Sequence, residues 1–365
     1  TAKDYYNQWY RPELMGVFII GDVDQKKAEQ IIKKYFANIK AKVPPNAPPV
    51  ASVPKYNQTQ FGVITDPELG GVMVQIYNRQ PKLFLETDVN YKDYLTREFT
   101  KNIFQKRLNR ILREQNTPLF SISVGTQDLT DNEEMYHASA HVKEDDFERG
   151  IKFLLTEIER VKQNGFVEDE LKLAKKDKLL SLEISLTQKN TTKSRDLLDE
   201  YKSHFLEKEM VSGIDYEFEL AKQVIKTIKL EDINNFFLKF YQPDDRIILI
   251  KGPEKYKDLI TKEMFLNYES EIAKTKTLQA DFALANKKLI NKKLTGSKIV
   301  KEIKYSNLDI TELHLANGVK VFLNLQNLKK KNLALMLEAL EVFHISHYLN
   351  YILLKMHKEL LTIVV

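Results

Sequence analysis

The hydrophobic pattern at the start of the chain predicts a helix, a strand and a second helix. Asp4–Tyr10 fits the last turns of a helix, which Pro12 ends because the residue before a proline disfavours helical geometry. The continuous apolar run Met15–Ile20 predicts a buried strand. Asp24 has a side chain favoured at a helix N-cap, and apolar residues then recur at helical spacing over Ala28–Phe36.

Beyond a proline-rich stretch at 44–56, the pattern changes to longer strands and helices. Alternating or continuous apolar runs predict strands, and apolar residues at helical spacing predict helices. Because the strands are followed by blocks of helices, we predict the α+β class, with an antiparallel sheet and helices packed on one face. The predicted strands are 60–64, 71–77, 119–125, 135–142 and 246–250, and the predicted helices are about 90–115, 144–163, 167–187, 191–208 and 217–240.

An internal repeat organises the chain. An aromatic residue, Tyr, any residue and Pro occur in this order twice, each time after an amphipathic helix and before an apolar strand and a Gly turn. Trp9–Pro12 leads to Gly21, and Phe240–Pro243 leads to Gly252. One such junction is common, but two with matched flanks a domain's length apart indicate a repeated unit. The first copy is then the end of one unit, and the second copy ends the next.

Composition and charge exclude several classes of function. The chain has no cysteine, which excludes disulfides, thiolate zinc sites, iron–sulfur clusters and cysteine nucleophiles. Its 56 basic and 51 acidic residues are interspersed, so the net charge of +5 is no nucleic-acid footprint. The Lys-rich stretch 274–304 alone would suggest a nucleic-acid binder, and we expect no such partner at physiological salt. No apolar run is long enough to predict a membrane span. The chain begins at Thr1 without a targeting segment, so we expect it to be the interior of a longer protein.

Three segments, taken in order, resemble the M16 (pitrilysin/insulinase) family of zinc peptidases. Tyr6–Asp24 resembles the junction in which a helix ending in Trp-Tyr-x-Pro precedes a strand ending in Gly-Asp-x-Asp. Phe166–Lys175 resembles a helix start in the second domain of the family, and Thr311–Val321 resembles the opening strand of a new unit. The resemblance covers most of residues 4–323 and is nearest to the large bacterial form with four homologous domains.

The resemblance implies a fold and a domain order. The fold is the LuxS/MPP-like metallohydrolase domain, repeated four times around a chamber for unfolded peptides. We therefore expect residues 1–43 to be the C-terminal end of a first domain, 44–56 a Pro-rich linker, 57–253 a complete non-catalytic second domain, 254–308 a Lys-rich linker between halves, and 309–365 the start of a third domain.

The catalytic motif of the family is absent from this sequence. The resemblance implies a His-x-x-Glu-His zinc motif with a downstream Glu ligand, in which the Glu of the motif activates the zinc-bound water. None of the seven histidines lies in such a frame. We therefore assign no catalytic residue and no metal ligand, and expect zinc in the parent protein only. The histidines are His137, His141, His204, His314, His344, His347 and His357.

Two interpretations of function stay open. In the first, the chain is a fragment of an M16-like zinc metalloendopeptidase, inactive alone, that forms chamber wall and connects the halves. Its partners would be peptide or unfolded polypeptide substrates and other M16-like domains. In the second, it belongs to a non-catalytic subunit or peptide-binding scaffold. The sequence assigns no substrate-binding residue, and the likeness to large bacterial relatives favours a periplasmic or exported location.

The remaining candidate sites have simpler explanations. His137 and His141 alternate as in a strand, where residues four apart are separated by about 13 Å, too far to share an ion. Gly70-Gly71 predicts a turn, because no phosphate-loop pattern surrounds it. The other candidates are Ser121 and Ser123, which lack a nucleophile-elbow context, Thr187–Ser194, which is a polar break between helices, and His344, His347 and His357, which have no partner carboxylate at zinc-motif spacing.

The family resemblance stops after Leu323. Codons for Glu338–His344, displaced by two bases, can encode Ser-Pro-Gly-Gly-Val-Ser, and related sequences carry a turn of that type. One hypothesis is therefore that a frameshift replaces the true third domain from about residue 325 onward. The alternative is a genuine amphipathic helix at the C-terminus.

Overall fold

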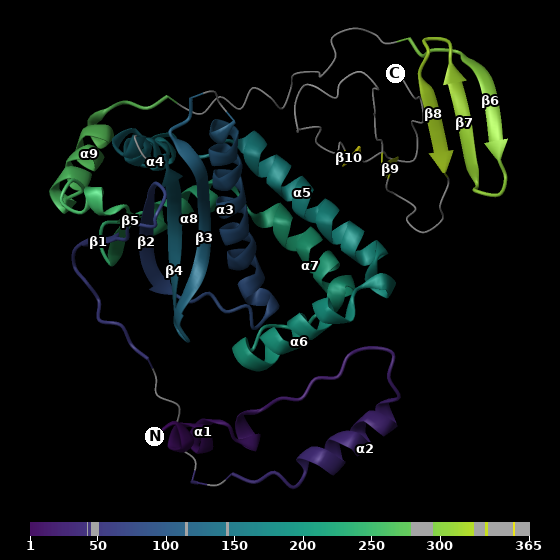
Figure 1. The fold of residues 1–365 in the computed structure, drawn as a ribbon, viewed down its shortest axis with the longest axis horizontal. Helices are drawn as coiled ribbons and strands as arrows, with labels where there is room; N and C mark the ends of the chain where they lie inside the picture. Colours follow the sequence, from purple (N-terminus) through teal and green to yellow (C-terminus); the bar gives the residue numbers. More distant parts are fainter. Residues whose placement is uncertain are drawn as a thin grey trace. The chain divides into compact units, whose positions relative to one another are not determined.

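The structure is a computed structural model (Figure 1). It describes residues 1–41, 43–44, 51–113, 116–143, 146–278 and 295–324, with short strand segments at 333–334 and 353–354. The chain divides into two compact units, Thr1–Ala285 and Asn286–Val365. The first unit contains the main sheet and its helices, and the second contains a smaller sheet.

Unit 1 is built on a five-stranded sheet in the order β1-β5-β2-β4-β3 (Figure 1). Its neighbouring strands are antiparallel except for β1 and β5, which are parallel. A strand lies at each of the five predicted places, so the α+β prediction is confirmed, with one parallel pair in a sheet expected to be antiparallel. The strands are β1 Gln60–Thr65, β2 Val72–Pro81, β3 Leu119–Thr130, β4 Glu133–Val142 and β5 Arg246–Gly252.

The other regular elements between residues 60 and 274 of unit 1 are helices. The prediction of one helix over 217–240 is wrong, because Ile228 and Lys229 are extended and the Lys229 backbone N–H donates to the Asp232 carboxylate at the start of α8. The helices are α3 Tyr91–Leu112, α4 Phe147–Asn164, α5 Glu168–Thr187, α6 Ser194–Glu207, α7 Gly213–Thr227, α8 Leu230–Phe240 and α9 Lys262–Lys274. Short 3-10 turns lie at η2 Asp88–Asn90, η4 Lys189–Thr191 and η5 Glu254–Tyr256.

The core lies between the sheet and the helices that cover one of its faces. Alternate residues of β2, β4 and β5 are buried, as expected when only one face of a sheet is covered. Aromatic rings from the helices fill the contact: the rings of Phe104 and Phe237 meet edge to face at 5.1 Å, and Tyr136 stacks on Phe240 at 4.8 Å. Such pairs stabilise the core beyond the burial of their area.

The segment Phe166–Lys175, singled out in the sequence, includes the first turns of α5 and an ion pair to α3. The Glu170 carboxylate accepts a hydrogen bond from the Val167 backbone N–H at 2.9 Å and one from Arg107 Nε at 2.6 Å. Both Glu170 and Arg107 are buried. The carboxylate therefore caps its own helix and joins it to α3 at the same time.

The predicted linker over 254–308 is wrong for residues 254–274. Tyr256, Ile260 and Phe265 are buried in the core of unit 1. Arg246 on β5 also donates two hydrogen bonds to the Glu269 carboxylate on α9, at 2.5 and 2.9 Å. The prediction of a linker rested on the many lysines of this stretch. Apolar residues between these lysines are buried, and they pack the helix onto the core. Further along, residues 299–305 form a strand of unit 2.

Residues 1–41 contain α1 Ala2–Trp9, η1 Pro12–Leu14 and α2 Gln25–Phe36. The N-cap prediction is confirmed, because the Asp24 carboxylate accepts from the Lys27 backbone N–H at 3.0 Å. The predicted buried strand at 15–20 is wrong: this run pairs with no strand of the described residues, and most of its side chains are exposed. In the second copy of the repeat, the matching strand is β5, which lies between β1 and β2. No strand of the described residues lies beside residues 15–20 in this way.

Unit 2 contains an antiparallel sheet in the order β6-β7-β8. The predicted opening strand at 311–321 is a hairpin whose turn contains Gly318, with a φ of +89° that favours glycine. The strands are β6 Ile299–Tyr305, β7 Ile310–Leu315, β8 Lys320–Asn324, β9 Leu333–Ala334 and β10 Leu353–Leu354. Residues 45–50 of the predicted proline-rich linker, and the predicted aberrant tail apart from β9 and β10, lie outside the described residues.

Candidate functional site

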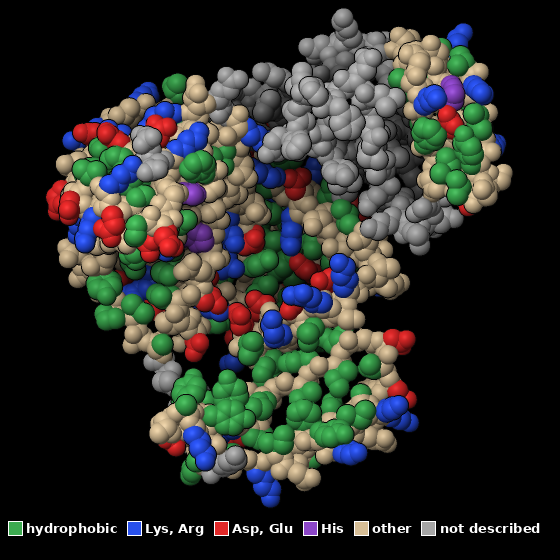
Figure 2. Space-filling view, in the orientation of Figure 1, with side chains coloured by type: hydrophobic (Ala, Val, Ile, Leu, Met, Phe, Trp, Pro, Cys, Tyr) green, Lys and Arg blue, Asp and Glu red, His purple; other side chains and the backbone are tan. Residues whose placement is uncertain are grey.

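One face of the five-stranded sheet carries side chains that the helical layer does not bury. Residues opposite one another in the strand register share this face, which is seen with its histidines in purple in Figure 2. We call it the open face. It is made of Gln60, Gly62, Ile64, Met73, Gln75, Tyr77, Ser121, Ser123, Gly125, Met135, His137, Ser139, His141, Ile247, Leu249 and Lys251.

The centre of the open face is uncharged and rich in hydrogen-bonding groups. Gln75 on β2 lies opposite Ser139 on β4, which lies opposite Ser123 on β3. The two serine hydroxyls are hydrogen-bonded at 2.8 Å. Within the described residues, neither Ser121 nor Ser123 is hydrogen-bonded to a histidine that could act as its base, although His141 lies opposite Ser121 in the register. These serines therefore form part of a polar surface, not a nucleophile site.

His137 lies in the middle of this surface. Its ring is 5.9 Å from the Tyr77 ring, and it lies against Gly125, where an added Cβ would be 2.7 Å from the imidazole. Glycine at 125 therefore leaves room for the ring. Among the described residues, no group is hydrogen-bonded to the buried Nδ1 atom of His137. Burial lowers the pKa of His137, and the charge of Lys101 on α3 lowers it further.

His141 lies at another place on the same strand and has different contacts. Its Nε2 is 2.9 Å from the Gly70 carbonyl oxygen, and its ring is 5.1 Å from the Phe120 ring. The predicted turn at Gly70-Gly71 is confirmed, since Gly71 has a φ of +93° and a Cβ there would be 2.6 Å from the Val142 carbonyl oxygen. The strand position predicted for His137 and His141 is also confirmed.

The remaining predicted sites are scattered. Residues 187–194 form the connection between α5 and α6, with η4 inside it and an ion pair of 2.8 Å from Lys189 to Asp215. His204 on α6 contacts the Glu209 carbonyl oxygen through Nδ1 at 2.6 Å. His314 on β7 contacts the Glu312 carboxylate at 2.8 Å. His344, His347 and His357 lie outside the described residues.

The described residues contain neither a cluster of metal ligands nor a membrane-spanning helix. Within the described ranges, no three His, Cys, Asp or Glu side chains gather as ligands of one metal ion. Among the helices of those ranges, none is both long enough and apolar enough to cross a membrane.

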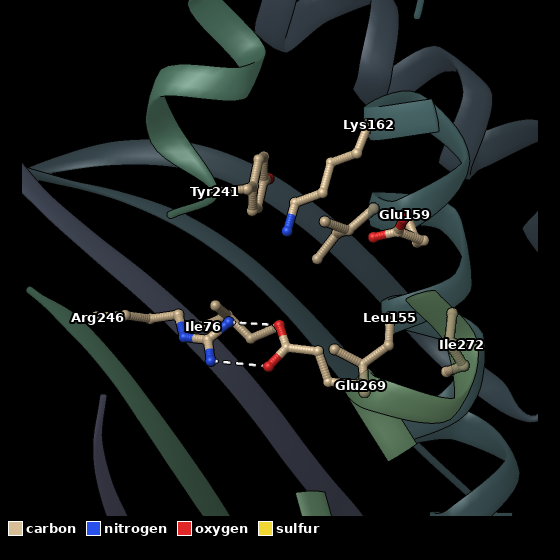
Figure 3. A pocket seen from close by; sticks show the side chains of 9 residues that line it. Ile76, Leu155, Glu159, Lys162, Tyr241, Arg246, Glu269 and Ile272 are labelled. Atoms are coloured by element: carbon tan, nitrogen blue, oxygen red, sulfur yellow. Dashed lines mark hydrogen bonds and ion pairs between the residues drawn. The ribbon is translucent and has the colours of Figure 1, made fainter. Parts of the chain in front are cut away.

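A small pocket that no sequence pattern indicated lies on the helical side of the sheet (Figure 3). Lys162 extends from α4 toward Tyr241, and the Arg246–Glu269 ion pair forms the opposite side. Burial lowers the pKa of Lys162, and the nearby Glu269 and Glu159 partly offset this effect. The cavity volume of about 10 Å³ is close to the smallest that holds one water molecule, so the pocket is too small for a substrate.

Comparison with known proteins relates the chain to peptidases. A family model described as "Peptidase M16 inactive domain" matches residues 1–178. The Arabidopsis thaliana protein named "Zinc protease PQQL-like" is 26% identical over 328 residues, which are 88% of this chain and 31% of that protein.

Solved structures share the fold. The periplasmic protease PqqL from Escherichia coli aligns with a TM-score of 0.70 at 19% identity, over 90% of this chain and 37% of its own. A variant of the ferredoxin protease FusC, in complex with Arabidopsis ferredoxin, aligns with a TM-score of 0.63 at 21% identity, over 88% of this chain and 36% of its own. The chain thus spans about a third of the length of these relatives.

Proposed function

This chain belongs to the M16 family of peptidases, and we propose that it forms a non-catalytic wall of the chamber in which a zinc endopeptidase of this family hydrolyses peptides. The inactive-domain sequence spans residues 1–178, and the 365 residues contain no His-x-x-Glu-His motif. In this proposal zinc is bound by the parent protein outside this chain. The chain contributes a surface that contacts the substrate, not the groups that cleave it.

The open face is the observation that carries the proposal. Its strands bury every second side chain against helices, and the alternate side chains stay accessible. Ser123 and Ser139 offer hydrogen bonds, and Tyr77 and Leu249 offer apolar area, without a strong charge at the centre. Such a surface suits unfolded polypeptides of varied sequence, because it demands no particular side chain from them.

The domain order extends the proposal to the rest of the chain. Residues 1–43 would end a preceding domain, in which the exposed apolar run 15–20 would lie between two strands, as β5 lies between β1 and β2. Residues 57–253 would form the second domain, completed by η5 and α9. Residues 309–365 would begin the third domain together with β6, which pairs with β7, so the stretch 275–298 would connect two halves.

We infer the class of substrate and the location of this chain from what is known of its relatives. FusC is a ferredoxin protease, and PqqL of Escherichia coli is a periplasmic protease. For this chain we propose unfolded polypeptide as the class of substrate and an exported location. A peptide-binding scaffold would use the same face, and it would differ in that the longer protein binds such chains without cleaving them.

Two measurements on the 365-residue chain test the proposal. After incubation with zinc and dialysis, we expect no stoichiometric zinc and no cleavage of a fluorescent peptide. We also expect the chain to bind a reduced, carboxymethylated polypeptide, followed by fluorescence anisotropy. Ser139→Arg places a large charged side chain on the open face and should weaken this binding about tenfold, or about 1.4 kcal/mol.

A matched variant makes the second measurement specific. Ser181 is exposed on α5, in the helical layer, so Ser181→Arg introduces the same side chain away from the open face. We expect it to bind polypeptide as the unaltered chain does. Equal binding by both variants, or retained zinc with peptide cleavage, would contradict the proposal.

A further inference from the structure

Helix α6 carries apolar side chains that its own domain does not bury. No side chain of this helix is buried. Tyr201 is 44% exposed and Phe205 is 47% exposed. At the C-terminal end of the helix the contact with the sheet is polar, because the Glu207 carboxylate accepts a hydrogen bond from Lys82 at 2.9 Å. Apolar side chains exposed together on one helix indicate a surface that another apolar element covers.

The first copy of the repeat supplies an element that contacts this helix. The rings of Phe18 and Phe205 meet edge to face at 5.7 Å, and a Cβ added at Gly16 would be 3.2 Å from Cζ of Phe205. A Cβ added at Gly21 would be 4.0 Å from the Ser194 hydroxyl oxygen. Five residues of extended chain and eleven residues of helix each span about 16–17 Å. The apolar run therefore lies along the helix.

One stripe of α6 faces the run. The two contact points on the helix are Ser194 and Phe205, and Leu198 and Tyr201 fall between them at the spacing of one helix face. All four side chains therefore point to the same side of the helix. The run covers only part of this stripe, since Tyr201 and Phe205 stay exposed.

The repeat identifies which side of the run contacts α6. When the two copies are aligned without a gap, Phe18 matches Leu249 of β5, which lies on the open face. Val17 matches Ile248, which is buried under the helical layer. Phe18 is also less exposed than Val17, at 36% against 46%. The run therefore presents to α6 the side that corresponds to the open face.

A difference between the two copies fits this contact. Gly16 of the first copy matches Ile247 of β5, whose side chain lies on the open face. A side chain at position 16 would be too close to the rings of both Phe18 and Phe205. Glycine at this position therefore leaves room for the ring that α6 contributes.

We propose that α6 packs on the open face of a sheet in the preceding domain, in which residues 15–20 form one strand. The strands on either side of that one would cover the remaining surface of Tyr201 and Phe205 with uncharged side chains. The helix is then an interface between two domains. This inference rests on the proposed domain order, and it adds the partner of a helix that its own domain leaves exposed.

Hydrogen exchange of the 365-residue chain tests the contact. Phe18→Ser removes the ring that contacts Phe205, so exchange in peptides covering α6 should become about fivefold faster or more. Val17→Ser is the matched control, because it makes a similar change on the opposite side of the run and should leave α6 unchanged. Exchange in β4 reports the folded sheet and should be the same in all three proteins. The proposal is overturned unless Phe18→Ser affects α6 more than Val17→Ser does.

Photo-crosslinking of the parent protein identifies the partner. A photoreactive phenylalanine analogue at Tyr201 should crosslink to peptides that precede Thr1, and the same analogue at Ser181 on α5 should not. Crosslinks from position 201 that never reach peptides before Thr1 would overturn the proposal. Neither experiment alters the open face of this domain, so polypeptide binding tests the proposed function separately. Loss of that binding with the Phe18 effect retained would contradict the proposed function alone.

Discussion

The side-chain amide of Gln105 on α3 is hydrogen-bonded to the backbone of Val124 on β3. Its oxygen accepts from the Val124 N–H at 2.8 Å, and its nitrogen donates to the Ile122 carbonyl oxygen at 3.1 Å. β3 lies at one end of the strand order, and no other strand of the described residues pairs with its outer edge. Gln105 therefore takes the place of a neighbouring strand and protects an edge that would otherwise favour pairing between molecules.

Loss of this contact should destabilise the domain and favour aggregation. Gln105→Ala removes both hydrogen bonds to β3, and we expect it to lower the free energy of unfolding by about 1–3 kcal/mol, measured by urea denaturation. Asn109→Ala is the control, because it removes only the hydrogen bond that Gln105 donates to Asn109 at 2.7 Å. The assigned role fails if the two variants are equally stable and equally soluble.

A glycine in α4 reports how closely that helix packs on the sheet. Gly150 lies against Val142 of β4, where an added Cβ would overlap the valine side chain. Gly150→Ala should therefore destabilise the protein by about 1–3 kcal/mol, although alanine favours helices. Gly70→Ala is the control, because a Cβ at 70 meets no atom of the described residues within 4 Å. Urea denaturation of both variants checks this, and a stabilised Gly150→Ala protein would show that the helix packs less closely.

His137 should make the stability of the fold depend on pH. Its pKa is lowered in the folded protein by burial and by Lys101, so the unfolded chain binds its proton more readily. The contribution of the neutral ring is fully present above the unfolded pKa of about 6.5 and is lost as pH falls through the lower folded pKa.

Replacement of His137 should reduce this dependence. Between pH 7.5 and 5, the free energy of unfolding of the unaltered chain should fall more steeply than that of His137→Gln, by at most about 1.4 kcal/mol per pH unit. Chemical denaturation at several pH values gives both slopes. Parallel curves for the two proteins would show that His137 is not responsible.

Local patterns predicted most of the elements, and long-range contacts explain where they did not. The helices and strands of residues 57–253 follow hydrophobic periodicity, and Asp24 caps α2 as its residue type suggests. The run 15–20 has the composition of a buried strand, but burial also needs neighbouring strands, which no local pattern supplies. Phe265 is buried through contacts with residues distant in the sequence, such as Phe61. The lysines near it in the sequence favoured the prediction of an exposed linker instead.

The sequence predicted the strand positions of the candidate site but not its contacts with other strands. Alternation placed His137 and His141 on one strand face, as found. The contacts of His137 with Tyr77 and Gly125 depend on the register of strands far apart in the sequence. The buried pair of Arg107 and Glu170 depends on the packing of two helices, and no motif marks it. Residue type and spacing thus predicted which face of β4 carries the histidines. The residues that contact these histidines could be identified only from the structure.

Site-specific photo-crosslinking tests most directly whether the open face contacts unfolded polypeptide. A photoreactive phenylalanine analogue is placed at Gln75 on the open face or at Ser181 on α5, and each chain is irradiated with a labelled, reduced and carboxymethylated polypeptide. The account predicts crosslinks from position 75 that excess unlabelled polypeptide suppresses, and none above background from position 181. Crosslinks of equal yield from both positions, or from position 181 alone, would contradict it.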